Sequence, residues 1–467
     1  MRSSLPKVLH SAAGQPLLFH ILDKIKETAP ESKIALVVGH GREQVEQQIR
    51  EHVPFSGLDI TFIIQAEQRG TGHAARCAMD SLWGQRVVKS KSPVLVLAGD
   101  TPLITADLIA EMLVPLPKSS PLRVLTTDLE DASGYGRIIR KGRSTGKSPG
   151  KLGPVLKIVE DKDATPSEKA VREINSGMYT FDSKFLSEGL HKLSDKNAQG
   201  ELYLTDLISQ AARLKKPAIA LKWKASDDLR GINDLWELAC ADRTLNERVV
   251  KNWAKQGVRF IDPWTTRVEV SVELSEGVTI HPGVNLLGST KIHKSVTIGP
   301  HVVLRDVEVH EGAHIKTGTF AEQSIIGPEA QVGPYAHFRP ESVVGRKSKI
   351  GNFVELKKTR VGDETSIAHL SYLGDAQVGS HVNIGCGFVT CNFDGRVING
   401  SRKHKTIIED EAFIGSDCQT IAPVTIGKGA YIGSGSTITD DVEAGALAIA
   451  RSRQVTKPGY VKKLKGA

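Results

Sequence analysis

In the N-terminal half, the residues that could do chemistry follow short apolar segments of the chain. Asp100 comes directly after the apolar run PVLVLAG, a position where a carboxylate often binds Mg²⁺ beside phosphates. In QAEQRGTGHA, Gly70 and Gly72 allow the backbone to approach a ligand closely, and the Gln65 amide can pair with a base edge. A helix cap at Asp100 and an ordinary glycine turn are the structural alternatives.

Further polar residues stand at the ends of other predicted elements. Lys7, in LPKVLH, carries a charge suited to a phosphate. Gly136 lies in GYGRI, Glu160 comes further along the chain, and Asn175 lies in EINSGM. Asn233 precedes a long helical pattern, where a helix cap is again the alternative.

The elements that must position these residues alternate between two kinds. Apolar runs at 33–39, 60–65 and 93–100 predict buried strands, and patterns at 17–25, 42–52 and 107–116 predict helices. This alternation favours a mostly parallel sheet with helices on both faces, whose ligands bind beyond the carboxyl ends of the strands. A helical pattern over 231–257 predicts a long linking helix.

From about Val272 the hydrophobic period changes to six. Aliphatic or aromatic residues six apart include Ile280, Leu286, Ile292, Ile298, Leu304, Ile326, Val332, Phe338, Val344, Ile350 and Leu356. A hexapeptide period predicts a parallel β-helix, in which each side of a coil is one six-residue unit. The segments HLSYLGDA and CNFDGRVINGSRKHKT interrupt the period with polar residues, so we expect function there.

Composition narrows the class of protein. The chain has 467 residues, 40% of them hydrophobic and 24% charged, which is typical of a globular protein with two or three domains. It shows no membrane-length apolar run and no secretory signal, so we expect no membrane partner. A net charge of +8 with only 5% aromatic residues favours small polyanions over nucleic acid. Five cysteines without paired spacing favour a reducing cytoplasm.

The ordered motifs resemble one enzyme family. LPKVLH, QAEQRGTGHA, GDTPLI, GYGRI, EINSG, NAQGELYLTD, GNFVELKK, HLSYLGDA and APVTIGKGA occur in this order between Met1 and about Arg451. They resemble those of the bacterial bifunctional N-acetylglucosamine-1-phosphate uridylyltransferase/glucosamine-1-phosphate N-acetyltransferases. The resemblance implies a Rossmann-like α/β nucleotidyltransferase domain over 1–235, a linker helix over 236–256 and a left-handed parallel β-helix over 257–467.

The resemblance also implies a uridylyl-transfer site that uses UTP and Mg²⁺. The residues expected to contact the nucleotide or the sugar phosphate are Lys7, Gln65, Gly70, Thr71, Ala98, Gly99, Gly136, Glu160, Asn175 and Asn233. Asp100 and Asn233 are expected to bind Mg²⁺. Such a site neutralises charge and aligns the attacking phosphate with the α-phosphorus of UTP.

For acetyl transfer, the resemblance makes His369 the general base and Glu355 the residue that orients its imidazole. The implied glucosamine 1-phosphate contacts are Arg339, Lys357, Tyr372, Asn383 and Lys403, and the implied acetyl-CoA contacts are Cys386, Asn392, Phe393, Ser416, Ser434 and Arg451. The chain departs from the family pattern at Cys386, Phe388 and Phe393, where the family has a small residue, a small polar residue and a tyrosine. The loop before Lys403 is longer than usual.

The expected activity is therefore synthesis of UDP-N-acetylglucosamine for peptidoglycan and, where present, lipid A. Acetyl-CoA would acetylate glucosamine 1-phosphate, and UTP would then react with N-acetylglucosamine 1-phosphate in the other domain. The resemblance further implies a cytoplasmic homotrimer with sites between subunits.

Three alternatives accompany this interpretation. Family members carry a strand and a glycine-rich turn before the lysine loop; Met1 falls at the end of that turn, so we expect a truncated phosphate site. An acetyltransferase with a weak or inactive first domain is therefore one alternative, and a non-catalytic assembly or regulatory subunit is another. A metal-dependent β-helix hydratase would need three convergent histidines, and His301, His310, His314 and His337 show no such set in the sequence.

Overall fold

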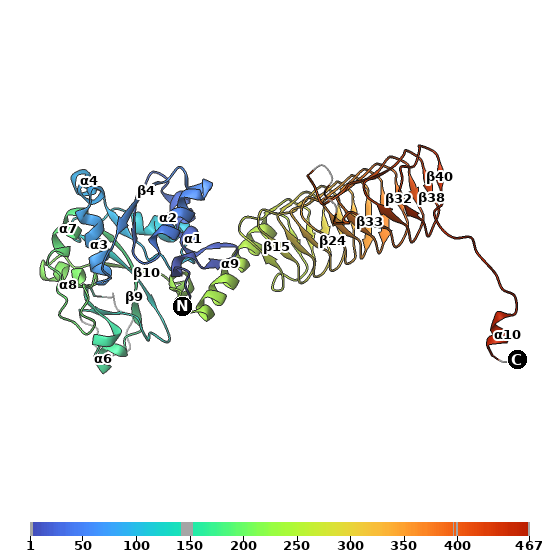
Figure 1. Cartoon of the computed structure of the whole chain (residues 1–467). Coiled ribbons are helices and arrows are strands. Elements are labelled where there is room, and N and C mark those ends of the chain that lie inside the picture. The colour runs from blue at the N-terminus through green and yellow to red at the C-terminus, as the bar shows by residue number, and fades with distance from the viewer. Residues whose placement is uncertain (1–2, 142–152, 396, 398–399, 466–467) are drawn as a thin grey trace. The chain divides into compact units, whose positions relative to one another are not determined.

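The chain folds into two compact units, residues 1–245 and 246–467. The computed structural model describes residues 3–141, 153–395, 397 and 400–465 (Figure 1). Helix α9 (Leu235–Lys255) crosses from one unit into the next, over the range where the sequence predicts a linking helix. Within the described ranges, no helix has both the length and the apolar character needed to cross a membrane.

The first unit contains two main sheets. Strands β3 (Lys33–Val38) and β4 (Asp59–Ile64) form a parallel pair, at the positions predicted from their apolar runs. The second sheet comprises β5 (Val94–Val96), β6 (Leu122–Asp128), β7 (Arg137–Arg140), β8 (Val155–Val159), β9 (Glu173–Phe181) and β10 (Ile219–Lys222). Because β5, β6 and β7 each pair antiparallel with β9, and β10 pairs parallel with β6, these four strands share one direction. The second sheet is therefore mostly parallel in direction, and β9 and β8, which each pair antiparallel with β7, run the opposite way.

Helices pack against these sheets through apolar faces. They are α1 (Leu17–Thr28), α2 (Arg42–Glu51), α3 (Thr71–Asp80), α4 (Leu82–Ser90), α5 (Ala106–Leu113), α7 (Ser183–Leu190) and α8 (Asp206–Arg213). The short helix α6 (Pro166–Lys169) has no buried residue. Along α1, Leu18 and Leu22 belong to the core around β3, while Ile21 belongs to the core around α5. The N-terminus of α5 is capped by Thr105, whose hydroxyl accepts a hydrogen bond from the Leu108 backbone N–H at 3.2 Å.

A cavity interrupts the packing of the first unit. Among the described strands, the β3–β4 pair forms no ladder with the six-stranded sheet. A cavity of about 1010 Å³ is lined both by β3, including Leu36, and by β5, including Val96. Apolar side chains of α1 line it as well, so the core of this unit is divided where its two sheets approach each other.

The second unit is a parallel β-solenoid of three long sheets (Figure 1). Its strands include β15 (Asn285–Leu287), β16 (Lys291–Ile292), β19 (Glu308–Val309), β20 (His314–Ile315), β26 (Lys349–Asn352), β27 (Glu355–Lys357), β29 (Ser366–His369), β30 (Tyr372–Gly374), β31 (Ala376–Val378), β32 (Asn383–Ile384), β33 (Val389–Cys391), β34 (Thr406–Ile408), β35 (Phe413–Ile414), β37 (Val424–Ile426), β38 (Tyr431–Ile432) and β40 (Leu447–Ala448). Helix α10 (Tyr460–Leu464) follows the solenoid.

The hexapeptide period explains the solenoid. Ile280 aligns with Ile298, and Leu286 with Leu304, each one coil later in the same sheet. Three hexapeptides therefore make one coil, and their aliphatic side chains stack in a continuous buried core. Phe388, which replaces a small polar residue of the family pattern, is fully buried in that core. The handedness stays a prediction from the resemblance.

Candidate functional site

In the first unit, three predicted residues from distant parts of the chain converge. Lys7 lies in the short 3-10 helix η1 (Lys7–Leu9), Asp100 follows β5, and Asn233 precedes α9. The Lys7 ammonium donates to Asp100 Oδ2 at 2.5 Å and to Asn233 Oδ1 at 2.9 Å. The Asp100 carbonyl accepts a hydrogen bond from the Ile232 N–H at 3.0 Å, which ties the two loops together.

This group fits the chemistry of a magnesium site. A carboxylate oxygen of Asp100 and an amide oxygen of Asn233 already share one cationic group, the Lys7 ammonium. Hard oxygen atoms of this kind are the ligands that Mg²⁺ prefers, usually together with phosphate oxygens and water. Asp100 and Asn233 could therefore hold the ion while Lys7 turns toward a phosphate.

Several other predicted residues line the polar part of the cavity. These are Thr71, Ala98, Gly99, Gly136, Glu160 and Asn175, together with Lys7. Glu160 Oε1 accepts a hydrogen bond from the Thr205 hydroxyl at 3.1 Å, and burial raises the pKa of its carboxyl group. The Gly136 carbonyl accepts from the Asn175 N–H at 2.9 Å. A Cβ at Gly136 would lie 2.9 Å from Ile158 Cγ2, so only glycine fits this rim without displacement.

The predicted glycine loop is held by a neighbouring segment. Gly70 adopts φ +94°, and a Cβ there would lie 2.8 Å from the Leu202 carbonyl oxygen. The Thr71 hydroxyl accepts from the Leu204 N–H at 3.3 Å. Gln65 donates from Nε2 to the Gly70 carbonyl at 3.2 Å, but neither Gln65 nor Gly70 is among the residues that line the cavity. Close packing against the segment around Leu202 thus accounts for the glycine at this position.

In the second unit, the predicted general base has a partner that the sequence did not identify. His369 is exposed at the end of β29, and its Nδ1 lies 2.7 Å from Asn352 Oδ1 on β26. Since an amide oxygen only accepts, this contact places the proton on Nδ1 and leaves Nε2 as the basic nitrogen. The amide of Asn352 therefore fixes the imidazole in the form that a general base requires.

The role of Glu355 in orienting His369 stays a prediction, and the described contacts of Glu355 are with Arg339 and His337. Glu355 lies on β27, in a different sheet of the solenoid from β29. Its carboxylate accepts from Arg339 at 3.1 Å and lies 3.9 Å from His337 Nδ1. Glu355 therefore positions the Arg339 guanidinium. Arg339, Lys357 and Tyr372 lie on aligned coils of this sheet, so the structure groups these predicted phosphate contacts.

A column of polar residues continues from His369 along the solenoid. Ile367, Ile384, Ile414 and Ile432 align on successive coils, and the column residues follow each of them by two positions. The column is therefore His369, Cys386, Ser416 and Ser434, with Arg451 near its end. Neighbouring parallel strands lie about 4.8 Å apart, so the column is roughly 14 Å long. Its geometry suits a narrow, extended ligand.

Three other predicted residues lie on or near the loop after β33. The Lys403 ammonium sits 4.5 Å from the centroid of the Phe393 ring, a cation–π contact. Asn392 is buried and donates to Asp375 Oδ2 at 2.5 Å, and Asn383 is exposed on β32. The described contact of Lys403 is thus with a predicted acetyl-CoA residue. Residues 396, 398 and 399 of this loop lie outside the described residues.

Sequence reasoning missed Asn352 and Thr205. Asn352 follows Ile350 by two positions, as His369 follows Ile367, so the hexapeptide register could have identified it. Thr205 touches Glu160 from a segment far along the chain, and no local pattern signals such a contact.

Comparisons with known proteins agree with both units. The nucleotidyl transferase family matches residues 2–244, and the bacterial transferase hexapeptide family (six repeats) matches 405–440. The "Bifunctional protein GlmU" of Exiguobacterium sibiricum is 41% identical over 98% of this chain and 96% of the relative. The protein of the same name from Shouchella clausii is 40% identical over 99% of this chain and 96% of the relative.

A solved UDP-glucose pyrophosphorylase complexed with UDP-glucose is similar over 52% of this chain and 91% of its own, at 16% identity and a TM-score of 0.39. The identity and coverage of the curated relatives carry the assignment. From the order of its motifs, its two folds and these relatives, this chain belongs to the bifunctional GlmU family.

Proposed function

We propose that the chain makes UDP-N-acetylglucosamine in two steps. Acetyl-CoA first acetylates the amine of glucosamine 1-phosphate on the solenoid. The first unit then joins N-acetylglucosamine 1-phosphate to the uridylyl group of UTP, and pyrophosphate leaves. Membership of the bifunctional GlmU family supports both reactions.

The observation that carries the acetyl-transfer step is the column that begins at His369. An extended thioester such as acetyl-CoA would lie along Cys386, Ser416 and Ser434, and its acetyl group would reach the basic Nε2 of His369. The imidazole removes a proton from the attacking amine while Asn352 holds the ring. Arg339 and Lys357 supply charge for the sugar phosphate.

The convergence of Lys7, Asp100 and Asn233 supports the uridylyl-transfer step. Lys7 contributes a positive charge for the phosphates of UTP, and the polar end of the cavity offers Glu160 and Asn175 to the nucleotide or sugar. When bound, Mg²⁺ would neutralise phosphate charge and assist the departure of pyrophosphate. Asp100 and Asn233 are the residues that would hold it.

The proposal includes a cytoplasmic homotrimer. All five cysteines are free thiols, which suits a reducing compartment. The match to hexapeptide-repeat transferases supports assembly through the solenoid.

The divided core of the first unit favours one alternative, an acetyltransferase whose uridylyl-transfer activity is weak. The phosphate-facing residues Lys7 and Gly99 border the same cavity that separates β3 from β5. If that cavity is flexible, the triphosphate is poorly aligned while the solenoid is unaffected.

Two variants in two assays test the proposal. Thiol release from acetyl-CoA with glucosamine 1-phosphate, and pyrophosphate release from UTP with N-acetylglucosamine 1-phosphate, are measured on the purified full chain. We expect His369→Ala to lower only thiol release, by roughly 10²–10⁴-fold. Asp100→Ala should lower only pyrophosphate release, by roughly 10²–10³-fold.

Matched controls are available for both variants. His381→Ala changes an exposed histidine of the solenoid, and Asp107→Ala changes an exposed carboxylate on α5; both should behave as the parent. A parent active only in thiol release establishes the acetyltransferase alternative. A parent inactive in both assays establishes the non-catalytic alternative.

A further inference from the structure

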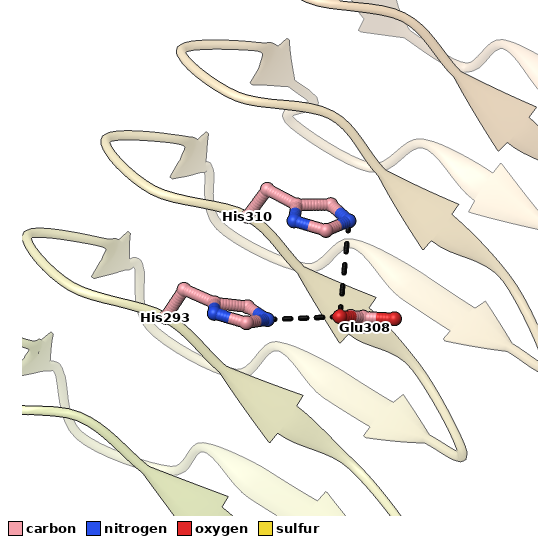
Figure 2. Close-up of side chains that lie close together, drawn as sticks. All are labelled: His293, Glu308 and His310. Atoms are coloured by element: carbon pink, nitrogen blue, oxygen red, sulfur yellow. Dashed lines mark hydrogen bonds and ion pairs between the residues drawn. The ribbon is translucent and has the colours of Figure 1, made fainter.

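Two histidines and a glutamate meet on one side of the solenoid (Figure 2). His293 follows β16 and His310 follows β19, and the two strands pair so that Ile292 aligns with Val309. The two histidines therefore hold equivalent places on successive coils. Their rings stack with centroids 4.9 Å apart and planes 12° apart, and both turn toward Glu308.

The ligand atoms of these residues converge. His293 Nε2 lies 2.9 Å from Glu308 Oε1, and His310 Nε2 lies 3.8 Å from the same oxygen. All three ligand atoms lie within 4.8 Å of one another. From this arrangement we propose that His293, Glu308 and His310 bind a divalent transition-metal ion of the Zn²⁺ class, in a site separate from both proposed reaction sites.

The distances suit a tetrahedral ion. Metal–ligand bonds of about 2.0–2.1 Å at tetrahedral angles place neighbouring ligand atoms about 3.3 Å apart. The two contacts to Glu308, 2.9 and 3.8 Å, lie on either side of that value. The third pair, the two histidine nitrogens, lies within 4.8 Å. Two imidazoles and one carboxylate form a ligand set that Zn²⁺ accepts, with the remaining position left to water.

The backbone holds the ligands in place. The His293 N–H donates to the Val309 carbonyl at 2.9 Å, and the His310 N–H donates to the Ile326 carbonyl at 2.9 Å. Both histidines are thus fixed in the parallel ladder, which lowers the entropy that the protein loses when the ion binds. Because His293 and His310 belong to different coils, the bound ion would link β16 to β19 through side chains as well as through the backbone.

A β-helix hydratase site needs three convergent histidines, and the sequence shows no such set among His301, His310, His314 and His337. The structure instead pairs His310 with His293, and a carboxylate takes the third position. Because the two histidines belong to successive coils, the ion would clamp these coils together.

The test uses the purified full chain after treatment with a chelator. Calorimetric titration with Zn²⁺, and the visible absorption of added Co²⁺, report binding and coordination. We expect the parent to bind one ion at this site. His293→Ala and His310→Ala should each lower the affinity for that ion at least about tenfold. Glu308→Gln should weaken the same site. Zn²⁺ should also raise the melting temperature of the parent solenoid but not that of His310→Ala.

Two controls separate this site from others. His314→Ala removes an exposed histidine on β20, in another sheet, and should keep the ion. Asp100→Ala alters the proposed Mg²⁺ site and should also keep it. Equal melting temperatures of parent and variants in chelator would show that these substitutions leave the fold intact. If the parent and His293→Ala bind Zn²⁺ with the same stoichiometry and affinity, the three residues form only a hydrogen-bonded cluster and the proposal is wrong.

Discussion

The two units bury their apolar side chains in different ways. In the solenoid, each inward aliphatic side chain stacks on its counterpart from the previous coil, and one core runs through the unit. In the first unit, the β3–β4 pair stands apart from the six-stranded sheet, and several smaller cores surround a cavity of about 1010 Å³. In the solenoid, the six-residue repeat gives every coil the same core contacts with its neighbours. In the first unit, by contrast, the core forms only when segments that are distant in the sequence pack together.

This difference should appear first as unequal stability. Closely packed interiors lose dispersion contacts wherever a void opens, so the residues around the cavity are held less firmly than the solenoid core. We therefore expect the first unit to open at a lower free energy than the solenoid. Hydrogen exchange resolves the two units separately, because peptides from β3 and β15 report local opening.

The largest effect is expected in the solenoid core. Leu286→Ala removes a fully buried side chain from β15, between neighbours that cannot collapse into the space. The expected loss is about 2–5 kcal/mol of unfolding free energy. Hydrogen exchange of peptides over 279–304 measures it. A loss below that range would show that the coils relax around a void, and the contrast between the units would fail.

The next largest effect is expected on acetyl transfer, when the proposed general base loses the partner that holds its ring. Asn352→Ala should lower the kcat of acetyl transfer by roughly 10–100-fold and shift its pH profile, since the imidazole loses the partner that fixes its tautomer. Glu355→Gln should mainly raise the KM for glucosamine 1-phosphate, since Glu355 contacts Arg339. Steady-state kinetics between pH 6 and 9 separates these outcomes. The reverse pattern would support the orienting role that the resemblance predicts for Glu355.

A smaller loss of unfolding free energy is expected for a substitution beside the cavity. Leu36→Ala deletes the same atoms as Leu286→Ala, but Leu36 is only half-buried and faces the cavity. We expect a cost of about 1 kcal/mol or less, because the removed side chain makes fewer contacts. Hydrogen exchange of peptides over 33–64 gives the measurement. A cost equal to that of Leu286→Ala would mean that the cavity is filled in solution.

The smallest effect is a pH dependence in the first unit. Burial raises the pKa of Glu160 above its ordinary value of 4.5, so the folded state holds this proton more tightly than the unfolded state. Its contribution to stability is complete below pH 4.5 and is lost as the pH rises through the higher folded pKa. Glu160→Gln should therefore stabilise the unit relative to the parent more at pH 8 than at pH 5. Melting curves at both pH values test this, and an equal difference at the two pH values would contradict it.

The same contrast explains how much the sequence could predict. The alignment of Ile280 and Leu286 with the next coil can be predicted from the sequence, because a strict period of six fixes which side chains face inward. Strands such as β3 are also recognisable, but no local pattern shows that β3 and β5 border a cavity. The role of Glu355 was expected only from the resemblance and stays a prediction, while its contact with Arg339 joins two coils and was not expected from the sequence.

The loop before Lys403 could not be placed either, since it lacks the period that defines the coils. His293 and Glu308 were also missed, although the hexapeptide register could have identified them, because Lys291 aligns with Glu308 and Ile292 with Val309 on the next coil.

One consequence of the solenoid concerns how such proteins change over evolution. The chain leaves the ladder after β33 and returns at β34, yet β34 pairs with β31 before it and with β37 after it. The excursion therefore leaves the stacking of the coils unchanged. Selection can vary the length and chemistry of this loop without remaking the scaffold, and a protein engineer could insert a reporter or a new recognition loop at the same place.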